Sequence, residues 1–144
     1  MIPFDFTKFD GWIERLKTAK HTQDRLCGGE NTGCCLGIGL LHLGANMEVF
    51  NRASYKLLYE GGTYIYYPPY QALEELVPRE WIISMAGGSD IRLSESAVAL
   101  SADELDGSTR NRISYVNDNS ENFDLVIKIL LLMKKEHIDG TIQF

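Results

Sequence analysis

Two adjacent cysteines, Cys34 and Cys35, open an apolar run that the sequence predicts to be helical. The dipole of a helix lowers the pKa of a thiol at its N-terminus, so either cysteine is a candidate nucleophile. Such a nucleophile needs a base, and His42 lies two turns along the same helix, out of hydrogen-bond reach of the thiols. Only a histidine from elsewhere, His21 or His137, could fill that role. We therefore favour the simpler interpretation, in which both cysteines are small buried side chains at the start of a core helix.

Zinc binding is a further interpretation of these cysteines. Together with Cys27, His21 and His42, they supply enough ligands in number. Their spacing matches neither the Cys-x2-Cys nor the His-x3-His pattern that is typical of structural zinc sites. We expect no catalytic residues, no metal and no cofactor, and we keep a cysteine- or zinc-dependent small enzyme as the alternative.

A glycine-rich segment, residues 28–33, leads into the Cys34 helix. Such a segment presents backbone N–H groups that favour an anion, and Arg25 lies just upstream. Cys34 stands where a P-loop has Lys-Ser or Lys-Thr, and Glu30 opposes an anion, so ATP hydrolysis of the Walker type is excluded. The pattern favours an ordinary loop; the functional hypothesis is a site for the phosphate of a nucleotide-like ligand. Its candidate ligand-binding residues are Arg25, Gly33 and Asn117.

Asn117 and Asp118 precede the last predicted helix, and one interpretation makes them a ligand-binding pair at the end of a strand. Asp118 and Glu121 also fit a capping box. In that arrangement the Asp118 carboxylate accepts a hydrogen bond from the backbone N–H of Glu121, and the Glu121 side chain reaches back. We favour the cap. It leaves Asn117 without a structural role and makes it the candidate ligand residue of the pair.

Six of the seven tyrosines fall within sixteen residues, on or beside a predicted hairpin over 55–67. Tyrosine offers a large contact area with a hydrogen-bonding tip, which suits a recognition surface. The same alternation also suits an edge hairpin that packs on a helix. The two interpretations are evenly balanced, and the candidate partner interface is Tyr64, Tyr66 and Tyr67.

Apolar periodicity predicts an α+β fold, with a small helical core and a short antiparallel β-hairpin or sheet. Three to five helices are expected, and the first, the Cys34 helix and the last form the core. Thr7 and Asp10 predict the N-cap of the first helix. The predicted elements are a helix over 8–19, a helix over 34–43, the hairpin with its turn at Gly61-Gly62, a helical segment containing Leu73 and Leu76, a second from Pro78 through Met85, and a helix from 123 to 139.

Residues 89–112 give mixed signals. Ser101 and Glu104 predict a capping box for one helical turn. Residues 106–108 predict a turn, and the alternating tail 141–144 predicts a short strand.

The composition indicates one domain, residues 1–144. Hydrophobic residues make up 44% and charged residues 24%, which excludes a largely disordered chain. A formal net charge of −6 argues against general nucleic-acid binding, which requires a basic surface. The longest aliphatic stretch is too short to span a bilayer, and the N-terminus does not look like a secretory signal. Three cysteines cannot all pair internally, so we expect free thiols and a cytoplasmic location.

Three short sequence blocks occur in order along the chain. They are Cys34-Cys35-Leu36-Gly37, then Val77-Pro78-Arg79-Glu80-Trp81, then Asn117-Asp118. This order resembles a family of small, mostly uncharacterised bacteriophage and prophage proteins, which carry an early Cys-Cys-Leu-Gly block, a Leu-Pro segment before a Trp-containing helix, and a late Asn-Asp block. Asn119-Ser120 departs from the Ser-Gly that usually follows, and the tyrosine-rich hairpin is not part of the pattern. The resemblance implies a phage origin and the cytoplasm of a bacterial host, but no mechanism.

Taken together, these features predict a non-enzymatic accessory protein that binds a host protein or a small signalling nucleotide, for instance to block an antiviral system. The alternatives are the thiol- or zinc-dependent enzyme above and an oligomeric structural or assembly protein that associates through the hairpin.

Overall fold

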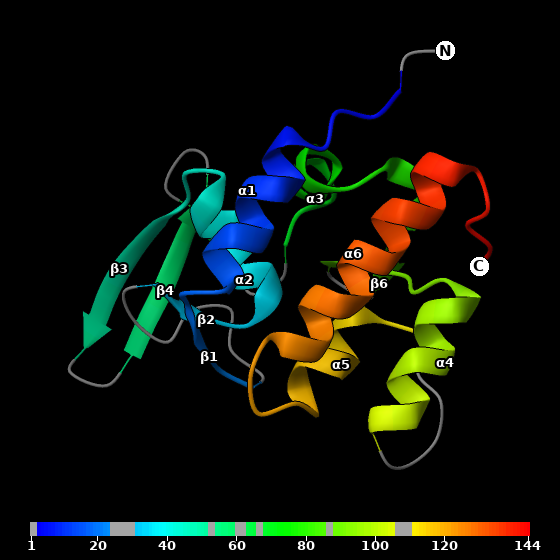
Figure 1. Ribbon diagram of the computed structural model, residues 1–144. Helices are drawn as coiled ribbons and strands as arrows, with labels where there is room; N and C mark the ends of the chain where they lie inside the picture. Colours follow the sequence, from blue (N-terminus) through cyan, green and yellow to red (C-terminus); the bar gives the residue numbers. More distant parts are fainter. Residues whose placement is uncertain are drawn as a thin grey trace.

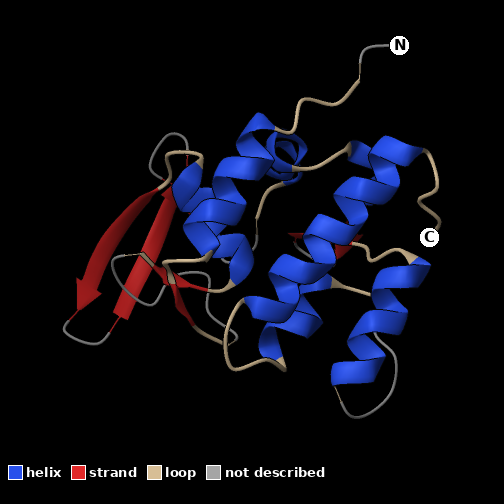
Figure 2. Ribbon diagram, viewed as in Figure 1, coloured by secondary structure: helices blue, strands red, loops and turns tan. Residues whose placement is uncertain are grey.

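The computed structural model describes residues 3–23, 31–51, 54–59, 63–65, 68–85, 88–105 and 111–144. These residues form the predicted α+β fold. Figure 1 shows a body of packed helices with β3 and β4 to one side of it, beyond α1 and α2. Figure 2 shows the same view, in which helix is the dominant structure of the body.

The described part of the chain contains six α-helices, one more than the upper end of the predicted range. The additional helices come from the middle of the sequence, where the periodicity was weakest. The helices are α1 (Thr7–Leu16), α2 (Cys35–His42), α3 (Tyr70–Leu76), α4 (Glu95–Glu104), α5 (Ile113–Asp118) and α6 (Asp124–Asp139), with a short 3₁₀ helix, η1 (Arg79–Trp81), after α3. None of the helices in these ranges is both long and apolar enough to cross a membrane.

Three small sheets accompany the helices. Strands β1 (Lys20–His21) and β2 (Thr32–Gly33) form a short parallel pair. Strands β3 (Asn46–Asn51), β4 (Ser54–Tyr59) and β5 (Thr63–Ile65) form an antiparallel sheet in that order. Strands β4 and β5 are the predicted hairpin, with Tyr59 opposite Thr63; its Gly61-Gly62 turn lies outside the described residues. Strands β6 (Ile82–Met85) and β7 (Gly88–Ile91) form a second antiparallel pair.

The core combines the three helices expected to form it with α3, α5 and the β6–β7 pair. The ring of Phe9 in α1 meets the rings of Trp12 and Trp81 edge to face. Such pairs add to the free energy gained by burying the rings. From α6 the buried contributors are Leu125, Val126, Ile129, Leu130 and Met133.

Two glycines allow α2 to approach its neighbours closely. A Cβ atom at Gly39 would lie 2.7 Å from Leu76 Cδ1 and 3.2 Å from Trp12 Nε1. A Cβ atom at Gly11 of α1 would lie 2.5 Å from His42 Nε2. Glycine lowers helix propensity, but at these two positions it allows the helices to pack closely. The Trp12 indole completes the contact by donating to the carbonyl of Cys35 over 2.9 Å.

The segment after Pro78 is only briefly helical, contrary to the prediction of a helix as far as Met85. After η1 the chain extends as β6 and pairs with β7, with Ile82 opposite Ile91. Four residues are too few for apolar spacing to distinguish helix from strand. The segment is a strand because it pairs with β7, and no local sequence pattern predicts that pairing.

The cap predicted at Ser101 was also wrong. The N-cap of α4 lies seven residues earlier, at Ser94, whose hydroxyl accepts the backbone N–H of Ala97. Ser101 lies inside α4 and donates to the carbonyl of Val98. The predicted turn at residues 106–108 lies outside the described residues. The tail after Gly140 is not a strand, but the carbonyl of Gln143 accepts the backbone N–H of Glu95 over 2.7 Å.

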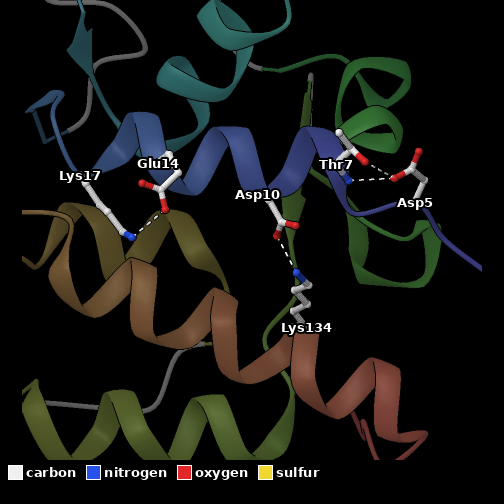
Figure 3. Close-up of polar contacts among 6 residues, drawn as sticks. All are labelled: Asp5, Thr7, Asp10, Glu14, Lys17 and Lys134. Carbon is white, nitrogen blue, oxygen red and sulfur yellow. Dashed lines mark hydrogen bonds and ion pairs between the residues drawn. The ribbon is translucent and has the colours of Figure 1, made fainter.

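The start of α1 is capped by Asp5 rather than by the predicted Thr7–Asp10 pair. Figure 3 shows the Asp5 carboxylate accepting both the backbone N–H and the hydroxyl of Thr7. These hydrogen bonds lower the pKa of Asp5. The Asp10 side chain instead pairs with Lys134 over 2.6 Å and so links α1 to α6 (Figure 3). Glu14 and Lys17 pair along α1 itself.

Candidate functional site

The N-terminus of α2 is capped by a cysteine. Cys34 is extended, and its sulfur accepts the backbone N–H of Gly37 over 3.4 Å. The backbone N–H of Leu36 also bonds to this thiol. Serine, threonine or asparagine usually fills this position. The sulfur of Cys34 therefore satisfies helix N–H groups that would otherwise lack a partner.

Burial makes both thiols weak acids. Removal from water raises the pKa of Cys34 to about 11, against the smaller opposing effect of the helix N–H groups. Cys35 is fully buried, and its pKa is raised well above the usual value for the same reason. A thiolate is the reactive form of cysteine, so these surroundings oppose the lowered pKa that a nucleophile needs.

Asn117 makes a further contact with the start of α2. It is fully buried, and its side-chain oxygen accepts the backbone N–H of Cys35 over 2.9 Å. Its side-chain nitrogen donates to the carbonyl of Thr22 and to the carboxylate of Asp118, each over 3.1 Å. Its amide thus links α5, the start of α2 and the segment after β1.

This arrangement overturns the predicted capping box at Asp118. Asp118 is the last residue of α5, so it ends one helix instead of starting the next. The predicted strand before it is α5 itself. At the start of α6, the Asn122 side chain accepts the backbone N–H of Asp124 over 2.9 Å. The sequence analysis did not predict that α5 ends at Asp118 and that Asn122 caps α6, because only a short segment separates the two helices.

The structure brings together two of the three candidate ligand residues. The carbonyl of Gly33 accepts the backbone N–H of Thr22, and the carbonyl of Thr22 accepts the amide of Asn117. Arg25 lies outside the described residues. The amide of Asn117 and the first N–H groups of α2 already have partners within the chain. A phosphate at this end of α2 would have to displace them, and the ligand-binding role of these residues stays a prediction.

Each histidine has contacts of its own. His21 Nε2 lies 2.8 Å from the carbonyl of Asn117, and its ring meets Phe123 edge to face. The His42 ring lies over Gly11, and burial lowers its pKa. His137 pairs with Glu80 across 3.5 Å. Over the ranges that the structure describes, no three histidine, cysteine or acidic side chains come together in a way that could hold a metal ion.

Asp90 is another buried polar residue, and no sequence pattern indicated it. It is fully buried on β7, yet its carboxylate accepts the backbone N–H groups of Ile91 and Ser114 over 2.8 and 3.3 Å. The Ser114 hydroxyl also donates to it. Burial raises the pKa of Asp90. Asp90 therefore serves as a tertiary cap for the start of α5, which has no local side-chain cap.

Comparison with protein-family models, curated proteins and solved structures finds no match to this chain. The resemblance to small phage proteins therefore stays a prediction that rests on the three sequence blocks.

The candidate partner interface lies on the three-stranded sheet. Tyr64 is in β5, opposite Leu58 of β4. Tyr66 and Tyr67 lie outside the described residues. This sheet is at the opposite side of the molecule from α4 in Figure 1, so the interface and the β7–α4 region are separate parts of the surface.

Proposed function

We propose that this chain acts by non-covalent binding of a partner protein, and that the sheet β3–β4–β5 around Tyr64 is the docking surface. The observation that carries the proposal is the register of this sheet, because it places Tyr64 on the same face as Lys56 and Glu48.

The register assigns each residue of the sheet to one of two faces. Leu57 is opposite both Met47 and Ile65, and Tyr55 is opposite Val49, so these apolar positions share a face. Tyr64 is opposite Leu58, which in turn is opposite Asn46. Lys56 and its partner Glu48 lie on this second face, because positions two apart in a strand share a face.

An antiparallel sheet with one apolar and one polar face usually turns the apolar face toward the protein. We take the face that carries Tyr64 as the docking face. This face carries Tyr64 and Leu58 beside a lysine, a glutamate and an asparagine, and an aromatic anchor with polar neighbours is typical of recognition surfaces.

The surroundings of the cysteines support binding rather than thiol catalysis. The sulfur of Cys34 is engaged in capping α2, and the pKa of both thiols is raised. Partnered N–H groups at the start of α2 favour a protein over a nucleotide as the ligand. That the partner is a bacterial protein, and the role a counter-defence one, follows from the resemblance to phage proteins alone.

The test is capture from bacterial lysate with the full chain as bait, followed by reconstitution with the captured protein after its purification. We expect a complex whose hydrogen exchange is slowed in residues 46–51, 54–59 and 63–65. Tyr64→Ala should weaken the complex about tenfold or more, as expected for an aromatic anchor. Tyr70→Ala, at a tyrosine of α3 away from the sheet, is the matched control and should leave the affinity unchanged.

Two results would overturn the proposal. One is a complex whose protection from exchange lies elsewhere and whose affinity is indifferent to Tyr64. The other is self-association of the purified chain through the sheet, which light scattering would detect as a discrete oligomer lost in Tyr64→Ala.

A further inference from the structure

A pocket of about 370 Å³ lies where the end of β7 meets the start of α4 and the C-terminal tail. Its lining residues are Arg92, Leu93, Glu95, Val98, Asn111 and Phe144. Figure 1 shows the tail ending beside the first turn of α4. The volume falls within the range of pockets that bind small molecules.

Backbone hydrogen bonds hold the walls of this pocket. The backbone N–H of Leu93 donates to the carbonyl of Asn111 over 2.9 Å, and that of Glu95 donates to the carbonyl of Gln143 over 2.7 Å. The segments that line the pocket are thus tied to one another. Leu93 is also almost fully buried and belongs to the hydrophobic core.

Arg92 of the pocket lining lies next to a second arginine, Arg112. Arg92 and Arg112 are opposite each other in an antiparallel bridge, and both are exposed. Like charges at directly opposite positions repel. Among the described residues no carboxylate lies within ion-pair distance of either guanidinium; the Asp90 carboxylate near Arg112 is held by Ser114. An oxyanion bound by Arg92 would offset this repulsion.

The pocket also carries an opposite charge and an apolar wall. Glu95 would accept hydrogen bonds from an ammonium group, which a purely anionic ligand does not offer. Leu93, Val98 and Phe144 form the apolar part, and Phe144 remains 39% exposed there. The lining thus presents a donor for a carboxylate, an acceptor for an amine and an apolar surface.

We infer that this pocket binds a small zwitterion with an apolar side chain, namely a free apolar α-amino acid. Arg92 binds the carboxylate, Glu95 binds the ammonium group, and the side chain packs against Leu93, Val98 and Phe144. The site is separate from the sheet proposed to dock a partner, so either proposal can fail without the other.

The test uses phenylalanine as the probe, titrated into the full chain and followed by amide chemical shifts in nuclear magnetic resonance. Saturable shifts are expected at residues 92–98, 111 and 144. N-acetylphenylalanine lacks the ammonium group and phenylalanine amide lacks the carboxylate, so each should bind about tenfold more weakly or worse. Arg92→Gln and Glu95→Gln should each weaken the binding of phenylalanine to a similar extent.

Arg79→Gln is the matched control, since Arg79 is an exposed arginine on η1 that pairs with Glu74. It should leave phenylalanine binding unchanged. Because Arg92 and Glu95 are exposed, their variants should keep the amide spectrum of the fold. The inference is overturned if phenylalanine produces no saturable shifts at the pocket, if N-acetylphenylalanine binds as well as phenylalanine, or if Arg92→Gln binds like the wild type.

Discussion

The side-chain oxygen of Asn117 accepts the backbone N–H of Cys35 over 2.9 Å, although 82 residues separate the two in the sequence. The same amide donates to the carbonyl of Thr22. One buried side chain thus supports the first turn of α2 and fixes α5 against it.

Replacing Asn117 should destabilise the fold. Asn117→Ala leaves the buried N–H of Cys35 without its side-chain acceptor and removes the hydrogen bond to the carbonyl of Thr22, which should cost about 2–4 kcal/mol in the free energy of unfolding. Urea denaturation measures this cost. Asn119→Ala is the control, since its exposed amide bonds only within α5, and it should cost less than about 1 kcal/mol. A similar, small loss in both variants would show that the contacts of Asn117 do not hold α2 in place.

Substitution by serine should have opposite effects on stability at the two cysteines. Cys34→Ser provides a better N-cap, so its free energy of unfolding should equal or exceed that of the wild type. Cys35→Ser places a hydroxyl in a fully buried apolar position and should cost about 1–3 kcal/mol. Urea denaturation of both variants provides the comparison. A larger loss for Cys34→Ser than for Cys35→Ser would refute the capping role of the Cys34 sulfur.

The same surroundings predict slow thiol chemistry. In a Cys27→Ser background, iodoacetamide at mildly alkaline pH should label the native chain far more slowly than the urea-unfolded chain, because Cys34, with a pKa of about 11, stays protonated. Rapid labelling of the native chain would instead indicate an activated thiol and would revive the enzymatic alternative.

Asp90 should make stability depend on pH. Its folded-state pKa is raised above 3.8, so the native state binds this proton more readily than the unfolded chain does. The resulting stabilisation is complete below pH 3.8 and is lost as pH rises through the folded-state pKa. Asp90→Asn keeps the hydrogen-bonding shape without the charge, so at neutral pH it should be as stable as the wild type or more so. That advantage should shrink as the solution is acidified.

Urea denaturation across this pH range measures the difference, with Asp90→Ala as the variant that loses the cap of α5 at every pH. A gap between wild type and Asp90→Asn that stays constant with pH would show that Asp90 does not titrate as its burial implies.

The crossing of α2 and α3 at Gly39 predicts a non-additive pair. Gly39→Ala places a methyl group 2.7 Å from Leu76 Cδ1 and should cost about 1–3 kcal/mol. In a Leu76→Ala background the same change should cost much less, since the obstructing atom is gone. Equal costs of Gly39→Ala in both backgrounds would place the strain elsewhere.

Local patterns predicted α1, α2, α6 and the β4–β5 hairpin because each carries its own signal, such as the stop of α6 at Gly140, whose φ is +72°. The pairing of Ile82 with Ile91, the capping of α5 by Asp90 and that of α2 by Asn117 depend on residues distant in sequence. No periodicity encodes such contacts. For the same reason the sequence marked Asn117 as chemically interesting but could not assign its hydrogen bonds.

The most direct test of partner binding through the sheet compares the affinity of the purified partner for three chains: the wild type, Tyr64→Ala and Cys34→Ser. Titration calorimetry should give equal affinities for the wild type and Cys34→Ser, and an affinity about tenfold lower or worse for Tyr64→Ala. The reverse pattern, in which binding survives Tyr64→Ala and is lost in Cys34→Ser, would contradict docking through the sheet and place the activity at the thiol.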